Sequence, residues 1–167
     1  AGDVNGDGVE DIVASVGGGA LVVWGKKAYR LPPPVGPELL SLSGDTRGTK
    51  LGRSVASAGD VNGDGILDLL VGAPGASVST RGAGAAYVVF GGYEWTVVNE
   101  AGTVDKDLLT GRNGFVVAGN ARGDALGQVS AAGDVNGDGV DDIVVGAPNA
   151  SPNGPGSGAV YVIFGRA

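Results

Sequence analysis

Short apolar runs alternate with glycine-rich polar segments along the whole chain. The runs at 87–90 and 161–164 read Tyr-Val-Val-Phe and Tyr-Val-Ile-Phe, and β-branched and aromatic residues of this kind favour strands. Those at 68–72 and 142–146 have a similar character. No run approaches the roughly 18 apolar residues of a membrane-spanning helix. The pattern predicts an all-β fold of short strands joined by glycine-rich turns.

An internal repeat accounts for most of this pattern. Residues 58–91 align with residues 132–165 without a gap, at an offset of 74 residues. A third copy opens the chain, but it has only 15 residues from Asp11 to Gly25, where the next copy has 24 from Asp68 to Gly91. Nine residues are therefore missing from its second loop. Self-similarity at a fixed period is typical of repeat architectures.

Each repeat unit predicts up to four strands, A to D. In the middle unit, strand A covers 53–58, strand B 68–72 and strand C 85–90, while strand D falls at either 107–110 or 114–117. The first copy lacks strand A and the last lacks strand D. This gives ten strands, or about two and a half four-stranded units.

Repeated four-stranded antiparallel units are typical of β-propeller blades. A stacked β-sandwich could give similar spacing, but a propeller is preferred because each unit supplies a complete meander. We expect a partial blade at about 1–45, a full blade at about 46–120 and a second partial blade at about 121–167. A closed propeller needs at least about four blades, so this segment is not expected to close alone.

One nine-residue segment, Asp-Val-Asn-Gly-Asp-Gly-x-x-Asp, occurs at 3–11, 60–68 and 134–142. Oxygen-bearing side chains stand at positions 1, 3, 5 and 9, the glycine at position 6 permits a sharp turn, and the carbonyl of position 7 adds an oxygen. This set suits Ca²⁺, which takes about six to eight oxygen ligands, better than Mg²⁺, which keeps more water. The predicted ligands of three calcium sites are Asp3, Asn5, Asp7, Val9, Asp11, Asp60, Asn62, Asp64, Ile66, Asp68, Asp134, Asn136, Asp138, Val140 and Asp142.

An EF-hand and a metal-free turn are two other interpretations of these segments. An EF-hand needs a Glu at position 12, but that position is Ala14, Val71 or Val145, inside an apolar strand. Without a metal, acidic Asx-Gly segments also form hairpin turns through local hydrogen bonds. Three copies with the same four ligand positions favour the metal site.

The acidic segments, together with Val-Gly-Ala-Pro at 71–74 and 145–148, resemble the FG-GAP repeat of integrin α-subunit β-propellers and their bacterial relatives. Leu-Gly at 51–52 and 126–127 stands where that family has Phe-Gly, and the first unit has Ala-Ser-Val-Gly at 14–17 in place of Gly-Ala-Pro. The resemblance implies a seven-bladed, calcium-stabilised propeller that is extracellular, serves adhesion or ligand binding, and is seldom catalytic.

Composition and charge agree with a non-catalytic role. The chain has no His and no Cys, which removes the usual general base and the usual zinc ligands. Its net charge of −7 disfavours nucleic acid and anionic membranes as partners. Nine of the 18 carboxylates occupy positions 1, 5 and 9 of the acidic segments. Three divalent ions would bring the charge to −7 + 6 = −1.

We therefore expect a non-catalytic calcium-binding β-propeller module for adhesion or structural scaffolding, extracellular or on a bacterial cell surface. Its partners are an unidentified protein or glycan ligand and either further copies of itself or the rest of a longer chain. We expect no nucleic acid binding and no membrane insertion. One alternative is a self-assembling fibre subunit joined through open blade edges such as 160–164. The other is an accessory propeller of a larger secreted enzyme.

Aromatic residues close strand C in each unit. Trp24, Phe90 and Phe164 occupy this position, and we expect them to pack between blades.

Overall fold

The computed structural model describes residues 1–25, 39–43, 48–92, 103–105, 109 and 111–167, and this part of the chain is all-β, as predicted. No helix long and apolar enough to cross a membrane occurs among these residues. The strands are β1 (Ile12–Val16), β2 (Gly19–Val23), β3 (Leu39–Ser43), β4 (Ser54–Gly59), β5 (Asp68–Ala73), β6 (Ala85–Val89), β7 (Thr103–Asp105), β8 (Gly114–Ala118), β9 (Gln128–Gly133), β10 (Asp142–Ala147) and β11 (Ala159–Ile163).

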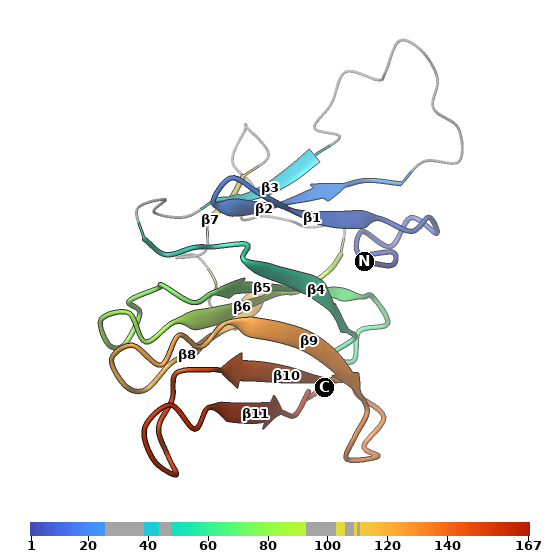
Figure 1. The fold of residues 1–167 in the computed structure, drawn as a ribbon. Coiled ribbons are helices and arrows are strands. Elements are labelled where there is room, and N and C mark those ends of the chain that lie inside the picture. Colours follow the sequence, from blue (N-terminus) through green and yellow to red (C-terminus); the bar gives the residue numbers. More distant parts are fainter. Residues whose placement is uncertain (26–38, 44–47, 93–102, 106–108, 110) are drawn as a thin grey trace.

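The strands form three sheets that stack one upon another (Figure 1). The middle sheet, β4-β5-β6-β8, is an antiparallel meander and corresponds to a complete blade with strands A to D. Of the two positions predicted for strand D, 114–117 is confirmed by β8. The other, 107–110, lies outside the described residues except for Leu109. The third sheet, β11-β10-β9, contains strands A to C of a further blade.

The first sheet has the order β1-β2-β3-β7. Its strands β1 and β2 are joined through Gly17 and Gly18 alone, at φ angles of 35° and 107°, which explains the nine residues missing from this copy. β7 comes from the middle of the chain and pairs in parallel with β3, which makes an eleventh strand beyond the ten predicted. The blade boundary expected near residue 45 falls within 44–47, outside the described residues.

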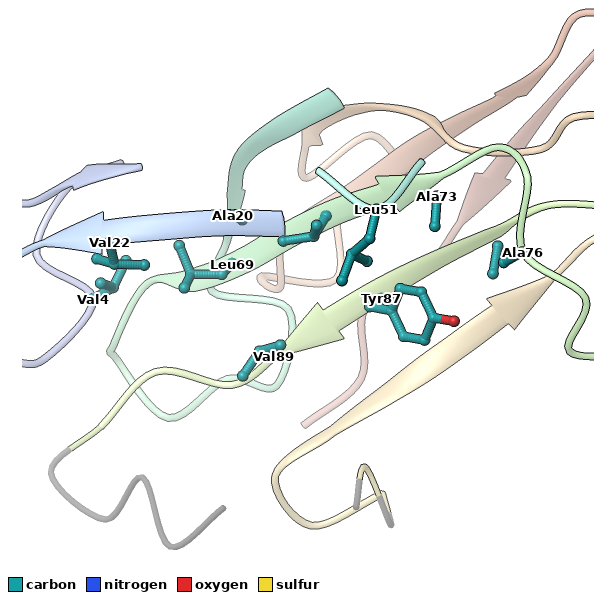
Figure 2. Close-up of a cluster of buried hydrophobic side chains, with 11 residues drawn as sticks. Val4, Ala20, Val22, Leu51, Leu69, Ala73, Ala76, Tyr87 and Val89 are labelled. Carbon is teal, nitrogen blue, oxygen red and sulfur yellow. The ribbon is translucent and has the colours of Figure 1, made fainter. Parts of the chain in front are cut away.

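Two hydrophobic clusters hold the three blades together. Side chains alternate between the two faces of a strand, so β5 and β6 contribute to both clusters and are buried along their whole length. The cluster between the first and middle blades contains Val4, Val22 and Leu69 (Figure 2). The cluster between the middle and third blades contains Leu70 and Ile143. The middle blade is thus enclosed between its two neighbours.

Candidate metal sites in the acidic loops

The three acidic segments form loops at the same end of the stacked sheets (Figure 1). Two of them, 60–68 and 134–142, connect strand A to strand B of their blades, from β4 to β5 and from β9 to β10. The first, 3–11, leads into β1, and Gly2 forms a bridge with Asp11 where strand A would end. The repeat therefore places each predicted ligand set at an equivalent position in its blade.

The side chains at positions 1, 3 and 5 fold each loop back on itself. Asp60 accepts the N–H of Asp64 on Oδ1 and that of Gly65 on Oδ2, at 3.0 and 2.8 Å. Asn62 Oδ1 also accepts the N–H of Asp64, and Asp64 Oδ1 accepts the N–H of Ile66. The same bonds recur in the other two loops. Such bonds to the local backbone are typical of Asx turns.

The glycines at position 6 have the backbone conformation that the sharp turn requires. Gly8, Gly65 and Gly139 have φ angles of 82°, 85° and 90°, in a region that favours glycine because it has no Cβ.

The ninth-position carboxylates are buried. Asp11, Asp68 and Asp142 are at most 2% exposed. One oxygen of each accepts the N–H of the position-2 valine of its own loop, at 2.9 Å in all three. The other accepts the N–H of the glycine that follows strand C, at 2.8 or 2.9 Å. The sequence pattern indicates these residues only as metal ligands and does not predict their link to strand C. The repeat does place a glycine at the equivalent position of each copy, namely Gly25, Gly91 and Gly165.

Burial acts directly on the charge of Asp68. The pKa of this carboxyl is raised from 3.8 to about 7, chiefly by desolvation. The hydrogen bonds from the N–H groups of Gly91 and Val61 lower the pKa, while the charges of Asp64 and Asp60 add to the rise. None of the basic side chains within the described residues forms an ion pair with Asp68. A buried carboxylate near other carboxylates therefore lacks a cationic partner here.

The exposed first position behaves differently. The pKa of Asp134 is lowered, chiefly by the N–H of Gly139 that its carboxylate accepts. Hydrogen bonds to the charged form favour that form. This carboxylate is therefore held ionised, as a metal ligand needs to be.

The donor atoms of each loop are of the kind that a hard cation binds. Across the described residues, no three or more Asp, Glu, His or Cys side chains are arranged as a metal-binding group. The loop carboxylates accept backbone N–H groups, as Asp60, Asp64 and Asp68 do in the middle loop. Asp60 accepts one such hydrogen bond on each of its carboxylate oxygens. Each oxygen keeps a second lone pair that can bind a cation. All the predicted donors are oxygens, the atoms that Ca²⁺ prefers. The ligand set itself stays a prediction.

The loops also contact the next blade. Gly92 donates its N–H to the carbonyl of Val4 at 3.0 Å, and Arg166 donates to the carbonyl of Val61 at 2.9 Å. Asp141, which stands beside the ninth position of the third loop, accepts the N–H of Asp60 on Oδ2 at 2.9 Å. The acidic loops are therefore also part of the joints between blades.

The chain is similar to known proteins that contain FG-GAP repeats. The FG-GAP repeat family matches residues 51–89 and 126–163. Integrin alpha pat-2 of Caenorhabditis elegans is 34% identical over 180 aligned residues, which cover 98% of this chain and 13% of that protein. Integrin alpha-V of Gallus gallus is 30% identical, covering 99% of this chain and 15% of its own length.

An enzyme is also among the similar proteins. Phosphatidylinositol-glycan-specific phospholipase D of Bos taurus is 40% identical over 121 residues, which cover 70% of this chain and 13% of that protein. The chain therefore spans only 13% to 15% of the length of these three relatives.

Proposed function

Because this chain belongs to the FG-GAP repeat proteins and folds as blades of an integrin α-like propeller, we propose that it is a calcium-binding β-propeller module. The module is extracellular, serves adhesion or structural scaffolding, and carries no catalytic site of its own. Its ligand is a protein or a glycan. The similarity to integrin α subunits over nearly the whole chain supports this assignment.

The observation that carries the proposal is the burial of three equivalent carboxylates, Asp11, Asp68 and Asp142, each at the end of an acidic loop. Burying a carboxylate is costly unless it is paired. A divalent ion in each loop would supply the missing charge, and Ca²⁺ suits an oxygen-only donor set. In each loop, the side chains at positions 1, 3, 5 and 9 and the carbonyl at position 7 would hold the ion. These residues are Asp3, Asn5, Asp7, Val9 and Asp11 in the first loop, Asp60, Asn62, Asp64, Ile66 and Asp68 in the second, and Asp134, Asn136, Asp138, Val140 and Asp142 in the third.

The calcium concentration that such a site requires also favours an extracellular location. Extracellular modules bind calcium at about 10⁻⁴ to 10⁻³ M, far above cytosolic levels. Binding to the folded state alone stabilises that state by mass action. In each loop the ninth residue, at the start of strand B, accepts the N–H of the glycine that follows strand C. An ion bound to this residue would therefore stabilise the blade as a whole.

A second candidate is an accessory propeller of a larger secreted enzyme. The similarity to phosphatidylinositol-glycan-specific phospholipase D, of which this chain matches 13%, favours it. In that case the catalytic residues lie in another part of the polypeptide. The complete reading frame distinguishes the two candidates, since an enzyme has a recognisable catalytic domain beside the propeller.

Thermal unfolding with and without calcium tests the main proposal. At calcium tenfold above the dissociation constant, each site should add about 1.4 kcal/mol and raise Tm by about 3 to 6 °C. Asp60→Asn should reduce this increase, and Asp124→Asn, outside the acidic loops, should leave it unchanged. Equal Tm values in millimolar calcium and in excess chelator would contradict calcium binding.

A further inference from the structure

The joint between the middle and third blades contains a reciprocal contact between two acidic loops. Asp141, at position 8 of the third loop, donates its backbone N–H to the carbonyl of Asp60 at 3.0 Å. Its side-chain Oδ2 accepts the N–H of Asp60 at 2.9 Å. Asp60 occupies position 1 of the middle loop. Both backbone polar groups of this residue are therefore held by the neighbouring blade.

The first two positions of the middle loop are held from both sides. The carboxylate oxygens of Asp60 accept two N–H groups of its own loop. Val61, the next residue, donates its N–H to Asp68 of the same loop, while its carbonyl accepts the N–H of Arg166 from the third blade, each at 2.9 Å. The orientation of this part of the loop thus depends on the third blade as well as on the loop itself.

A glycine allows Asp141 to approach the middle loop so closely. Gly59 precedes Asp60 and has a φ angle of 82°. A Cβ on Gly59 would lie 2.3 Å from Oδ2 of Asp141 and 2.6 Å from its Cβ. Because no side chain fits between them, the carboxylate of Asp141 reaches the backbone of the loop directly.

The joint between the first and middle blades has a leucine in the place of Asp141. Leu67 occupies position 8 of the middle loop. A Cβ on Gly2, the counterpart of Gly59, would lie 2.2 Å from Cδ1 of Leu67. The leucine side chain therefore faces the first loop as Asp141 faces the middle loop, but it has no oxygen that could accept the N–H of Asp3. The two joints thus differ in how they hold position 1 of an acidic loop.

We propose that Asp141 is a positioning residue for the calcium site of the middle blade. This inference rests on the proposed calcium binding, in which Asp60 is the position-1 ligand. Ordering a ligand before the ion arrives reduces the conformational entropy lost on binding and so raises affinity. Asp141 supplies this order to the middle loop from the third blade. The calcium affinity of the middle blade therefore depends on the packing of the third blade beside it, and bound calcium in turn stabilises that packing.

Calcium titration of chains that keep a single site tests this proposal. In each such chain, alanine replaces the position-1 aspartate of the other two loops. Where only loop 60–68 is intact, Asp141→Leu should weaken calcium binding about three- to tenfold, the effect of losing one hydrogen bond that orders the loop. Where only loop 134–142 is intact, the same substitution should leave the dissociation constant unchanged, because all predicted ligands of that loop are still present.

Three further variants separate the hydrogen bond from charge and from folding. Asp141→Asn keeps an oxygen that can accept the N–H of Asp60, so it should bind calcium like the wild type in about 1 M salt, which screens charges beyond about 3 Å. Asp124→Leu is the matched control, since it removes a carboxylate that accepts one backbone N–H outside the acidic loops, and it should leave the 60–68 site unchanged. Circular dichroism establishes that each variant is folded. Asp141→Ala removes the same acceptor without adding volume and replaces the leucine variant if that one does not fold.

Amide hydrogen exchange, followed by NMR in the metal-free protein, measures the contact without calcium. Asp141→Leu should speed the exchange of the Asp60 amide severalfold. The Asp64 amide should follow, because it donates to the carboxylate of Asp60. The amide of Asp7, which makes the same bond in the first loop, should exchange as in the wild type. Unchanged exchange at Asp60 would overturn the positioning role whatever the calcium affinity.

The possible results distinguish this inference from calcium binding itself. A wild-type chain that binds no calcium contradicts the proposed function, and with it any role of Asp141 at a calcium site. A chain that binds calcium with a 60–68 site insensitive to Asp141→Leu overturns this inference alone. So does equal weakening of the 60–68 and 134–142 sites, which indicates a general structural effect. Equal weakening by Asp141→Asn and Asp141→Leu in high salt would show that the hydrogen bond does not position Asp60.

Discussion

The carboxylate of Asp68 accepts the backbone N–H of Gly91, 23 residues further along the chain, with 2.8 Å between Oδ1 and N. Its other oxygen accepts the N–H of Val61 at the start of the same acidic loop. One buried side chain thus connects the loop, the beginning of β5 and the residues that follow β6. The ninth position of the repeat has a structural role in addition to its proposed role as a metal ligand.

Removing this carboxylate should destabilise the protein even without calcium. Asp68→Ala leaves two buried N–H groups without an acceptor, at about 1–3 kcal/mol each, so the free energy of unfolding should fall by about 2–6 kcal/mol. Urea unfolding in excess chelator measures this loss. The control is Asp124→Ala, which removes one exposed acceptor, of the N–H of Ala121, and should cost less than about 1 kcal/mol. Equal losses in the two variants would show that Asp68 does not fix the strands.

The metal-free protein should lose stability as the pH rises toward neutrality. Burial raises the pKa of Asp68 from 3.8 to about 7, so between these values the folded state holds a proton that the unfolded state has lost. The contribution of Asp68 is therefore full below pH 3.8 and is lost as the pH rises through 7. The slope is at most about 1.4 kcal/mol per pH unit.

Urea unfolding in chelator between about pH 5 and about pH 7 measures this component. Other carboxylates also titrate, so the informative quantity is the difference between the wild type and Asp68→Asn, which cannot ionise. The wild type should lose more stability with rising pH than the variant. Added calcium should oppose this trend, since metal ligands bind in the deprotonated form. Parallel pH profiles for the two proteins in chelator would refute a raised pKa.

Two glycines at the same repeat position should respond differently to alanine. A Cβ on Gly72 would lie 1.9 Å from the backbone oxygen of Gly127, at the start of the third blade, whereas a Cβ on Gly146 would lie 3.3 Å from the Cβ of Gln128. Gly72→Ala should therefore destabilise the chain by about 1–3 kcal/mol. Gly146→Ala should be close to neutral, because alanine also lowers the entropy of the unfolded chain.

Chemical unfolding at a dilution where the chain is monomeric compares these two variants. The pair is matched in residue type, strand and repeat position, so a difference reports on blade packing alone. Similar stabilities for the two variants would mean that the middle and third blades are not packed as closely as the structure shows.

The strands of the middle blade could be predicted because the sequence repeats. The ranges 53–58, 68–72 and 85–90 agree within one residue at each end with β4, β5 and β6, since alternating apolar residues and glycine-rich loops recur in each copy. The pairing of β7 with β3 could not be predicted. A three-residue strand is too short to show a periodic pattern in the sequence. Its pairing depends on which sheet edge lies beside it in the fold, here that of β3.

Burial was harder to predict than strand position. Phe90 and Phe164 are equivalent in sequence, but only Phe90 packs in the structure, with its ring centroid 6.0 Å from that of Phe115. Phe164 is exposed because no blade follows it in this structure. The repeat shows which face of a strand is apolar, and the surroundings decide whether that face is covered. The hydrogen bonds from the glycines after strand C to Asp11, Asp68 and Asp142 likewise depend on the fold, and the sequence pattern alone did not predict them.

The number of calcium ions bound per chain tests the central claim most directly. Isothermal titration of metal-free protein should give three ions per chain, and Asp3→Ala, Asp60→Ala and Asp134→Ala should each remove one, while Asp124→Ala should remove none. A loss of one site per variant would assign the sites to the three acidic loops. No binding at millimolar calcium, or a stoichiometry that these three variants leave unchanged, would contradict the account.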